Sequence, residues 1–218
     1  MGSVLGGLLP LAVGVALSPI PIIAAILMIM AKNARGAAVG FAAGWVAGIL
    51  VVTGVLTMLA GTLGGTDTAP SKGASVVKIV LGAALVVLAV IQWQERSDTS
   101  VPGWMQAIDT LTPLKATGLG VVLSAVNPKN LLLCVSAGVA IGSGGLSAGS
   151  EVVAIVVFTL LASSTVLAVV LGYLLAADRL RPPLDSLRQW LQNNNHEVMA
   201  IVLLIMGTVV VGKGIGGL

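Results

Sequence analysis

The chain places a lysine directly after a proline and between two asparagines, in the middle of a long apolar segment. The run is Asn127-Pro128-Lys129-Asn130, and no acidic residue lies near it in the sequence. An ammonium group at the centre of a bilayer costs roughly 2.5–3.5 kcal/mol on insertion scales, so its presence there indicates a function. A helix that begins at Pro128 would add free N–H groups and positive potential. We therefore predict a binding site for an anionic group, formed by Lys129, Asn127 and Asn130.

A second run with similar chemistry interrupts the first apolar segment. Ser18-Pro19-Ile20-Pro21 places two prolines around a single residue. Proline inside a helix removes a backbone hydrogen bond and clashes with the preceding turn, so Pro19, Pro21 and likewise Pro128 would break their helices. Ser18 would then offer a hydroxyl beside backbone groups that have lost their partners. Matching interruptions in the two halves of a membrane protein indicate where a substrate binds.

Each interruption has an alternative explanation. The prolines of the first could produce a kink packed against a neighbouring helix, and Lys129 could extend to an interface with its stem in lipid. The pattern Gly-Val-x-Leu-Ser, at 14–18 and again at 120–124, favours one ancestral element present in each half. A third polar cluster, Ser163–Thr165, could line a pathway or bond back to its own helix.

The remaining reactive residue types exclude several classes of site. All eight acidic residues fall in loops or at segment ends, which argues against a carboxylate-built cation site or a buried proton relay. His196 lies in a polar loop, and Cys134 is the only cysteine, so no disulfide or cysteine-built metal site is expected. We find no set of nucleophile, base and acid and no phosphate-binding glycine loop. We therefore expect no enzyme activity, no catalytic residue, no cofactor and no metal.

The composition indicates the setting of these residues. The 218-residue chain is 57% hydrophobic and 9% charged, whereas soluble proteins average about 25% charged. The net charge of +3 comes from short loops and gives no basic face for nucleic acid. Six segments are long enough to cross a bilayer, which takes about 20 apolar residues. They are Val4–Met30, Val39–Gly61, Ser75–Trp93, Thr117–Ile141, Val152–Ala176 and Val198–Gly212.

Small residues and amphipathic stretches predict how these segments pack. Gly40, Gly44 and Gly48 are spaced by four and would form a helix contact on the second segment. The stretches Trp104–Ile108 and Leu184–Leu191 are expected to form short amphipathic helices along the membrane surface. The first segment lacks a basic n-region, so we expect it to be retained and not removed as a signal peptide.

Lysines and arginines set the expected orientation. Seven of them lie in the first, third and fifth connections, against two or three in the other loops and near the ends, which places those three connections in the cytoplasm and both termini outside. With three helices per half, the second half enters from the opposite side. Residues 1–115 and 116–218 would then form two inverted repeats. A weaker match between 81–87 and 206–211 relates the third helices of the two halves.

The two interrupted motifs resemble the signature of the LysE transporter superfamily. The runs Ser18–Pro21 and Asn127–Asn130 carry the resemblance, with Phe41–Trp45 in support. Within the superfamily the chain is most similar to the GAP branch, the peptidoglycolipid-addressing proteins of mycobacteria and other actinobacteria. The resemblance covers essentially the whole length and implies six helices, an inverted repeat and export of glycolipids or their building blocks. Amino-acid exporters of the superfamily carry a similar Asn-Pro-Lys element, so the motif indicates the fold more than the substrate.

The sequence therefore predicts an all-α integral membrane protein of six transmembrane helices, arranged as two inverted three-helix repeats, with helices 1 and 4 broken by proline motifs. We expect it to lie in a bacterial inner membrane and to export or flip a lipid, glycolipid or glycolipid precursor with an anionic headgroup. The alternatives are a small amino-acid or metabolite exporter and a non-catalytic scaffold for lipid export. The expected partners are the lipid or glycolipid substrate, a second copy of the chain, and proteins of lipid synthesis or export.

Overall fold

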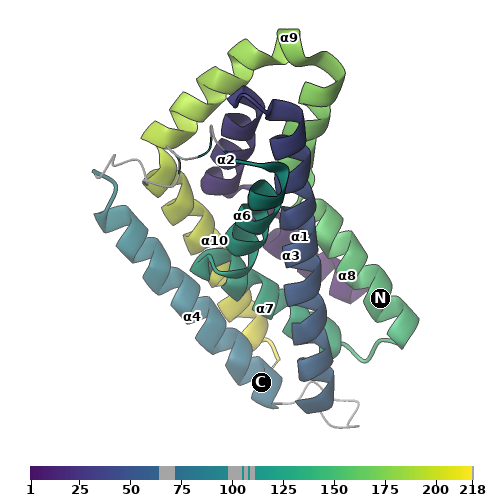
Figure 1. The fold of residues 1–218 in the computed structure, drawn as a ribbon. Helices are drawn as coiled ribbons and strands as arrows, with labels where there is room; N and C mark the ends of the chain where they lie inside the picture. Colours follow the sequence, from purple (N-terminus) through teal and green to yellow (C-terminus); the bar gives the residue numbers. More distant parts are fainter. Residues whose placement is uncertain (64–71, 98–104, 106–107, 109–110, 218) are drawn as a thin grey trace.

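The computed structural model describes residues 1–63, 72–97, 105, 108 and 111–217, and its regular elements are helices (Figure 1). The first half contains α1, α2, α3 and α4, and the second half contains α6, α7, α8, α9 and α10. Their bounds are α1 Gly2–Ala16, α2 Pro19–Met30, α3 Ala34–Leu63, α4 Lys72–Gln94, α6 Pro113–Ala125, α7 Pro128–Gly142, α8 Ala148–Ala162, α9 Ser164–Asn193 and α10 Asn195–Ile215.

Three of these helices are long and apolar enough to cross a membrane alone. Three bent pairs of helices also reach this length when each pair is taken as one span. The single helices cover Ala34–Gly61, Ser75–Gln94 and Asn195–Ile215. The pairs are α1 with α2, α6 with α7, and α8 with the first part of α9, bent by 52°, 66° and 61°. Up to six spans result, so the prediction of an all-α membrane protein is confirmed. The predicted breaks in the first and fourth spans are confirmed as well.

The fifth predicted span, Val152–Ala176, is present, but it contains a break that was not predicted from the sequence. It divides at Ser163, where α8 ends and α9 begins. No proline lies at this break, whereas Pro19 and Pro128 are the first residues of α2 and α7. Two consecutive serines stand at this break, and their hydroxyls compete with the backbone hydrogen bonds of the helix. A serine pair is a weaker sign of a break than a proline, which explains why this break was not predicted.

Close backbone contact joins the first half to the second through α3 and α6. A Cβ added at Gly40 would lie 2.5 Å from the Pro113 carbonyl oxygen, and one added at Gly44 would collide with the carbonyl of Thr117. Gly48 is next in the row and faces Ser124. The predicted glycine contact is therefore confirmed, with α6 as the partner helix.

A second close contact joins α4 to α10, and it is reciprocal. A Cβ added at Gly82 would lie 2.8 Å from the Gly207 carbonyl oxygen, and one added at Gly207 would lie 2.9 Å from the Gly82 carbonyl oxygen. Gly82 also faces Val211 while Gly207 faces Val86, in each case with the added Cβ 2.7 Å from a valine methyl. Each helix therefore presents corresponding residues of the matching sequences 81–87 and 206–211 to the other.

The second part of α9 lies over one end of the bundle, while both chain ends lie toward the other (Figure 1). A kink at Ala176, with φ −148° and ψ 50°, turns the helix. Leu184 and Leu191 then pack on a cluster that includes Ile22 and Ile26 of α2. The stretch Leu184–Leu191 is thus helical as predicted. Of the other expected amphipathic stretch, Trp104–Ile108, only Met105 and Ile108 are among the described residues.

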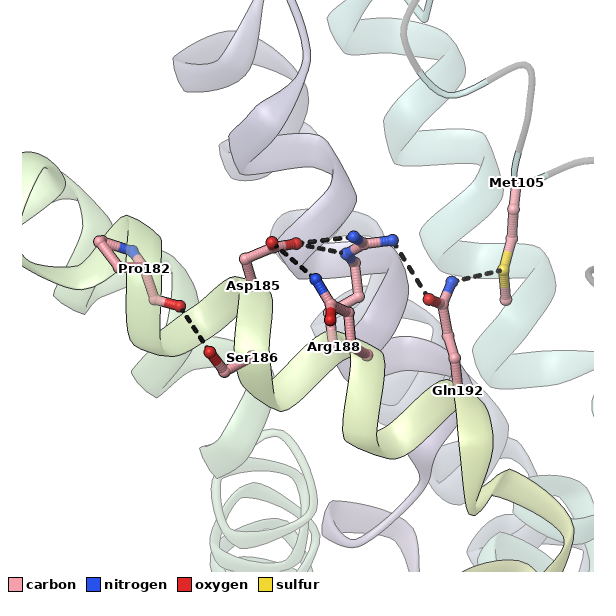
Figure 2. A network of polar contacts seen from close by, with 7 residues as sticks. Met105, Pro182, Asp185, Ser186, Arg188 and Gln192 are labelled. Atoms are coloured by element: carbon pink, nitrogen blue, oxygen red, sulfur yellow. Dashed lines mark hydrogen bonds and ion pairs between the residues drawn. The ribbon is translucent and has the colours of Figure 1, made fainter.

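Polar side chains of α9 form a network beside this apolar contact (Figure 2). Arg188 donates from Nη2 and Nε to one oxygen of Asp185, at 2.6 and 2.9 Å, and from Nη1 to Gln192 at 3.1 Å. Gln192 in turn approaches the Met105 sulfur at 4.0 Å. The network pairs the charges of Asp185 and Arg188 with each other, so the second part of α9 is amphipathic.

The α3–α6 contact predicts a difference between two glycines of the same helix. Gly44→Ala should destabilise the protein by about 1–3 kcal/mol, because the new methyl group overpacks against the backbone of α6. Gly54→Ala is the matched control, since nothing lies within 4 Å of a Cβ added there. Alanine should be neutral or mildly stabilising at Gly54. Denaturant unfolding of the purified variants measures both, and equal stability of the two would contradict the contact.

Candidate functional site

Lys129 lies in the first turn of α7, inside the bundle. It is 2% exposed, and its Nζ has no hydrogen-bond partner within the described part of the chain. In that part Arg188 forms an ion pair with Asp185, and the Glu95 carboxylate lies 4.0 Å from the His196 ring, so neither carboxylate pairs with Lys129. A buried unpaired charge costs several kcal/mol. The ammonium is therefore a donor for which the described residues supply no acceptor.

The two asparagines beside Lys129 serve the broken backbone. Asn127 is the N-cap of α7, and its Oδ1 accepts from the Lys129 backbone N–H at 3.1 Å. Asn130 donates from Nδ2 to the Leu123 carbonyl at 3.3 Å, across the break to α6. Its Oδ1 is buried without a partner among the described residues. Asn127 therefore contributes its oxygen to the fold, while Asn130 keeps one group free.

Ser18 occupies the corresponding place at the first break. It is the N-cap residue of α2 and is 1% exposed, but its hydroxyl makes no capping bond and has no partner in the described region. The break leaves the carbonyl of Ala16 without its helical partner, and the Thr165 hydroxyl donates to it at 2.6 Å. Neither prediction for Thr165 included this bond, which ties the break at Ser18 to the break at Ser163.

The three breaks lie at the ends of three half-helices that pack against one another. α1, α7 and α8 pack against one another in pairs. A Cβ added at Gly144 would lie 2.9 Å from Val4, and one added at Gly14 would lie 3.1 Å from Leu133, so α1 and α7 run antiparallel. Continuing this register by about one turn places the end of α1 beside the first turn of α7. Ser18 and Lys129 therefore lie at about the same level along the two packed helices.

We use the name break site for the residues at these ends that keep a buried polar side-chain atom without a partner among the described residues. Ser163, at the third break, has such a hydroxyl and is fully buried. A site of this kind offers one cation, hydroxyl groups and an amide oxygen in an otherwise apolar interior. Its members are Ser18, Lys129, Asn130 and Ser163.

An apolar layer lies about one turn from the break site, toward the end of the bundle that carries the chain termini. Met206 of α10 and Leu133 of α7 converge on Gly14, where an added Cβ would lie 2.7 Å from Met206 Cγ. Both side chains are buried. The layer lies between the break site and that end of the bundle, and Lys129 is buried.

Two further lysines were considered in the sequence only as markers of orientation. Lys78 of α4 and Lys213 of α10 line one cavity together. Lys78 lies within the predicted segment Ser75–Trp93, so its signal was present in the sequence, whereas Lys213 directly follows the predicted segment Val198–Gly212 and falls within the apolar helix Asn195–Ile215. For metal ions, the described residues contain no group of three or more His, Cys, Asp or Glu side chains.

A comparison with protein-family models finds a match over nearly the whole chain. A family model described as Sap, sulfolipid-1-addressing protein (SfLAP), matches residues 8–216. The chain belongs to this family. The match extends from α1 to α10 and includes all three breaks. SfLAP membership supports a lipid-related membrane protein, while searches of curated proteins and of solved structures found no significant match.

The bond between two breaks predicts a specific cost. Thr165→Val should destabilise the protein by about 1–3 kcal/mol, because it leaves the buried Ala16 carbonyl without a donor. Thr208→Val is the matched control, since Thr208 is exposed and bonds back to Leu204 and Ile205 of its own helix. Its effect should stay within about 0.5 kcal/mol. Denaturant unfolding compares the variants, and an equal effect would mean that the bond does not join the breaks.

Proposed function

We propose that the protein exports or flips a lipid or glycolipid with an anionic headgroup, and that it does so without enzyme activity. The observation that carries this proposal is the buried Lys129 ammonium, which has no acceptor among the described residues. An anionic headgroup would neutralise the charge while bound. The family name supports this chemistry, because a sulfolipid carries a sulfur oxyanion that stays charged at any physiological pH.

The break site would divide recognition among its residues. Lys129 would supply the charge and up to three N–H donors. The hydroxyls of Ser18 and Ser163 would donate to further oxyanion oxygens, and the Asn130 oxygen would accept from a headgroup hydroxyl. Asn127 would contribute through its amide nitrogen, since its oxygen already accepts from the Lys129 backbone. Pro19, Pro21 and Pro128 would keep the helices open around this set.

We also propose that the two halves, 1–115 and 116–218, are inverted repeats of the LysE type, close to the GAP branch. The reciprocal contact of Gly82 with Gly207 supports the repeat, because elements related by a twofold axis present the same residues to each other. The Gly-Val-x-Leu-Ser match does not superimpose the breaks. Ser18 caps α2, whereas Ser124 lies inside α6, three residues before the cap at Asn127, and donates to Val121.

The proposed orientation in a bacterial inner membrane places both termini outside. The excess of lysine and arginine in the first, third and fifth connections supports it. Single cysteines in a Cys134→Ala background test it by labelling of intact cells. A cysteine at exposed Ser147, between α7 and α8, should react from outside, and one at exposed Lys32, between α2 and α3, only after the cells are opened. The reverse pattern would invert the proposal.

Transport by Lys129 variants tests the function directly. Proteoliposomes should move a fluorescent sulfated galactosylceramide between leaflets, and Lys129→Met should abolish this movement because the headgroup loses its counter-charge. Loss of one partner of a desolvated charge pair costs about 2–5 kcal/mol, or roughly 30- to 5,000-fold in affinity. Lys129→Arg should rescue only partly, because guanidinium has another shape. Lys129→Glu should be worse than Lys129→Met.

Controls separate this function from its alternatives. Lys115→Met removes an exposed lysine at the start of α6 and should leave transport unchanged. Uptake of a small amino acid that depends on Lys129, with no lipid movement, would favour the metabolite exporter. Lipid export in cells that survives Lys129→Met would favour a scaffold. Wild-type lipid movement by Lys129→Met would refute the proposed site.

A further inference from the structure

A cavity of about 390 Å³ opens between α1, α4, α7 and α10, and it is distinct from the break site. Its lining residues come from the first turns of α1, from the end of α7, and from the ends of α4 and α10 that lie near the chain termini. They include Ser3 and Gly7 of α1, Lys78 of α4, Ser136 and Ser143 of α7, and Lys213 of α10. We call this space the vestibule. Its volume falls within the range of small-molecule sites, about 300–1,000 Å³.

The vestibule contains two positive charges and no acidic residue in its lining. Lys213 donates from Nζ to the Gly7 carbonyl at 2.6 Å, which leaves two of its three N–H donors free. Lys78 is half-buried and makes no contact with an acceptor among the described residues. Two like charges in one partly desolvated space repel each other, so an anion between them would be bound by both.

The vestibule serines provide acceptors instead of donors. The Ser136 hydroxyl donates to the Leu132 carbonyl at 2.8 Å, and the Ser143 hydroxyl donates to the Val139 carbonyl at 2.6 Å. A hydroxyl has one proton, so both oxygens can only accept from a ligand. The vestibule therefore combines two cations with hydroxyl acceptors. This set complements a ligand that carries both an anionic group and hydroxyl donors, as a sulfated or phosphorylated sugar does.

One face of α7 connects the vestibule with the break site. Lys129, Ser136 and Ser143 are spaced by seven residues, so they lie on one face with about 10 Å between successive residues along the axis. The layer of Gly14, Leu133 and Met206 lies between Lys129 and the vestibule. The two sites would thus be successive positions on one path, with the apolar layer between them.

From this arrangement we propose that the vestibule is a second binding site, which holds the anionic sugar headgroup of the transported lipid through Lys78 and Lys213 on the terminal side of the apolar layer. Its place in a transport path rests on the proposed function, whereas the binding itself does not. The same chemistry would also accept a free sugar sulfate, so a lipid and a soluble headgroup must be compared.

Native mass spectrometry of the full chain in detergent counts the bound ligands. The probes are sulfated galactosylceramide, galactose 3-sulfate as its free headgroup, and uncharged galactosylceramide. Wild type should bind two sulfated galactosylceramides. The double variant Lys78→Gln with Lys213→Gln should lose one of the two, with at least about tenfold weaker binding for each lysine. Lys129→Met should lose the other, and Lys115→Gln, outside the vestibule, should keep both.

Three further comparisons make the outcome decisive. Lys78→Arg with Lys213→Arg should retain binding, because arginine keeps both positive charges. Ser136→Ala should weaken galactose 3-sulfate more than inorganic sulfate, because inorganic sulfate has no sugar hydroxyls. Binding of the soluble headgroup in addition to the lipid would show that the vestibule opens to water, and binding of the lipid alone would show entry from the membrane.

The two proposals fail separately. Loss of vestibule binding in the Lys78/Lys213 double glutamine variant, with no effect of Lys129→Met, would refute the break site and leave the vestibule supported. Equal occupancy by wild type and the double glutamine variant would overturn the vestibule. Equal binding of the uncharged galactosylceramide at that position would also overturn it, because the two charges would then play no part.

Discussion

The Lys129 ammonium is buried in an interior whose described residues supply it with no hydrogen-bond acceptor, and the helix breaks around it leave further polar groups without partners. A bilayer provides no water for freed backbone groups, so a broken helix must find partners within the protein. Asn127, Asn130 and Thr165 supply such partners at the breaks. Among the described residues, eight buried side-chain atoms remain without a partner, and four of them belong to the break site. These four are the groups that the break site offers to a ligand.

The continuous helices hold the broken ones in place. Glycines let α3 approach α6, and let α4 approach α10, until backbone touches backbone. Such contacts are typical of membrane helices, where small residues replace the hydrophobic effect as the source of packing. The ends of the broken spans instead meet through side chains: the Thr165 hydroxyl of α9 donates to the Ala16 carbonyl of α1, and Met206 of α10 lies against Gly14 of α1. The structure thus combines a closely packed frame with breaks that are joined through side chains.

Features that depend on a single local property of the chain could be predicted from the sequence. Proline breaks at Pro19 and Pro128, the glycine row at Gly40–Gly48 and the burial of Lys129 follow from helix geometry and apolar length alone. The break at Ser163 could not be predicted in this way, because a serine hydroxyl competes only weakly with the hydrogen bonds of a helix. The bond from Thr165 to Ala16 and the pairing of Lys78 with Lys213 depend on helices that are far apart in sequence. Only the packed structure brings them together.

Crystals of the full chain grown with selenate, an anomalously scattering analogue of sulfate, give the most direct test of the central claim. The central claim is that the Lys129 ammonium binds an anionic group of the substrate. The account predicts an anomalous selenium peak within hydrogen-bonding distance of Lys129 Nζ, with Ser18 or Ser163 also in contact, and loss of this peak in Lys129→Met. Density that shows Nζ bonded to a protein carbonyl or carboxylate, with no selenium beside it, would contradict the account.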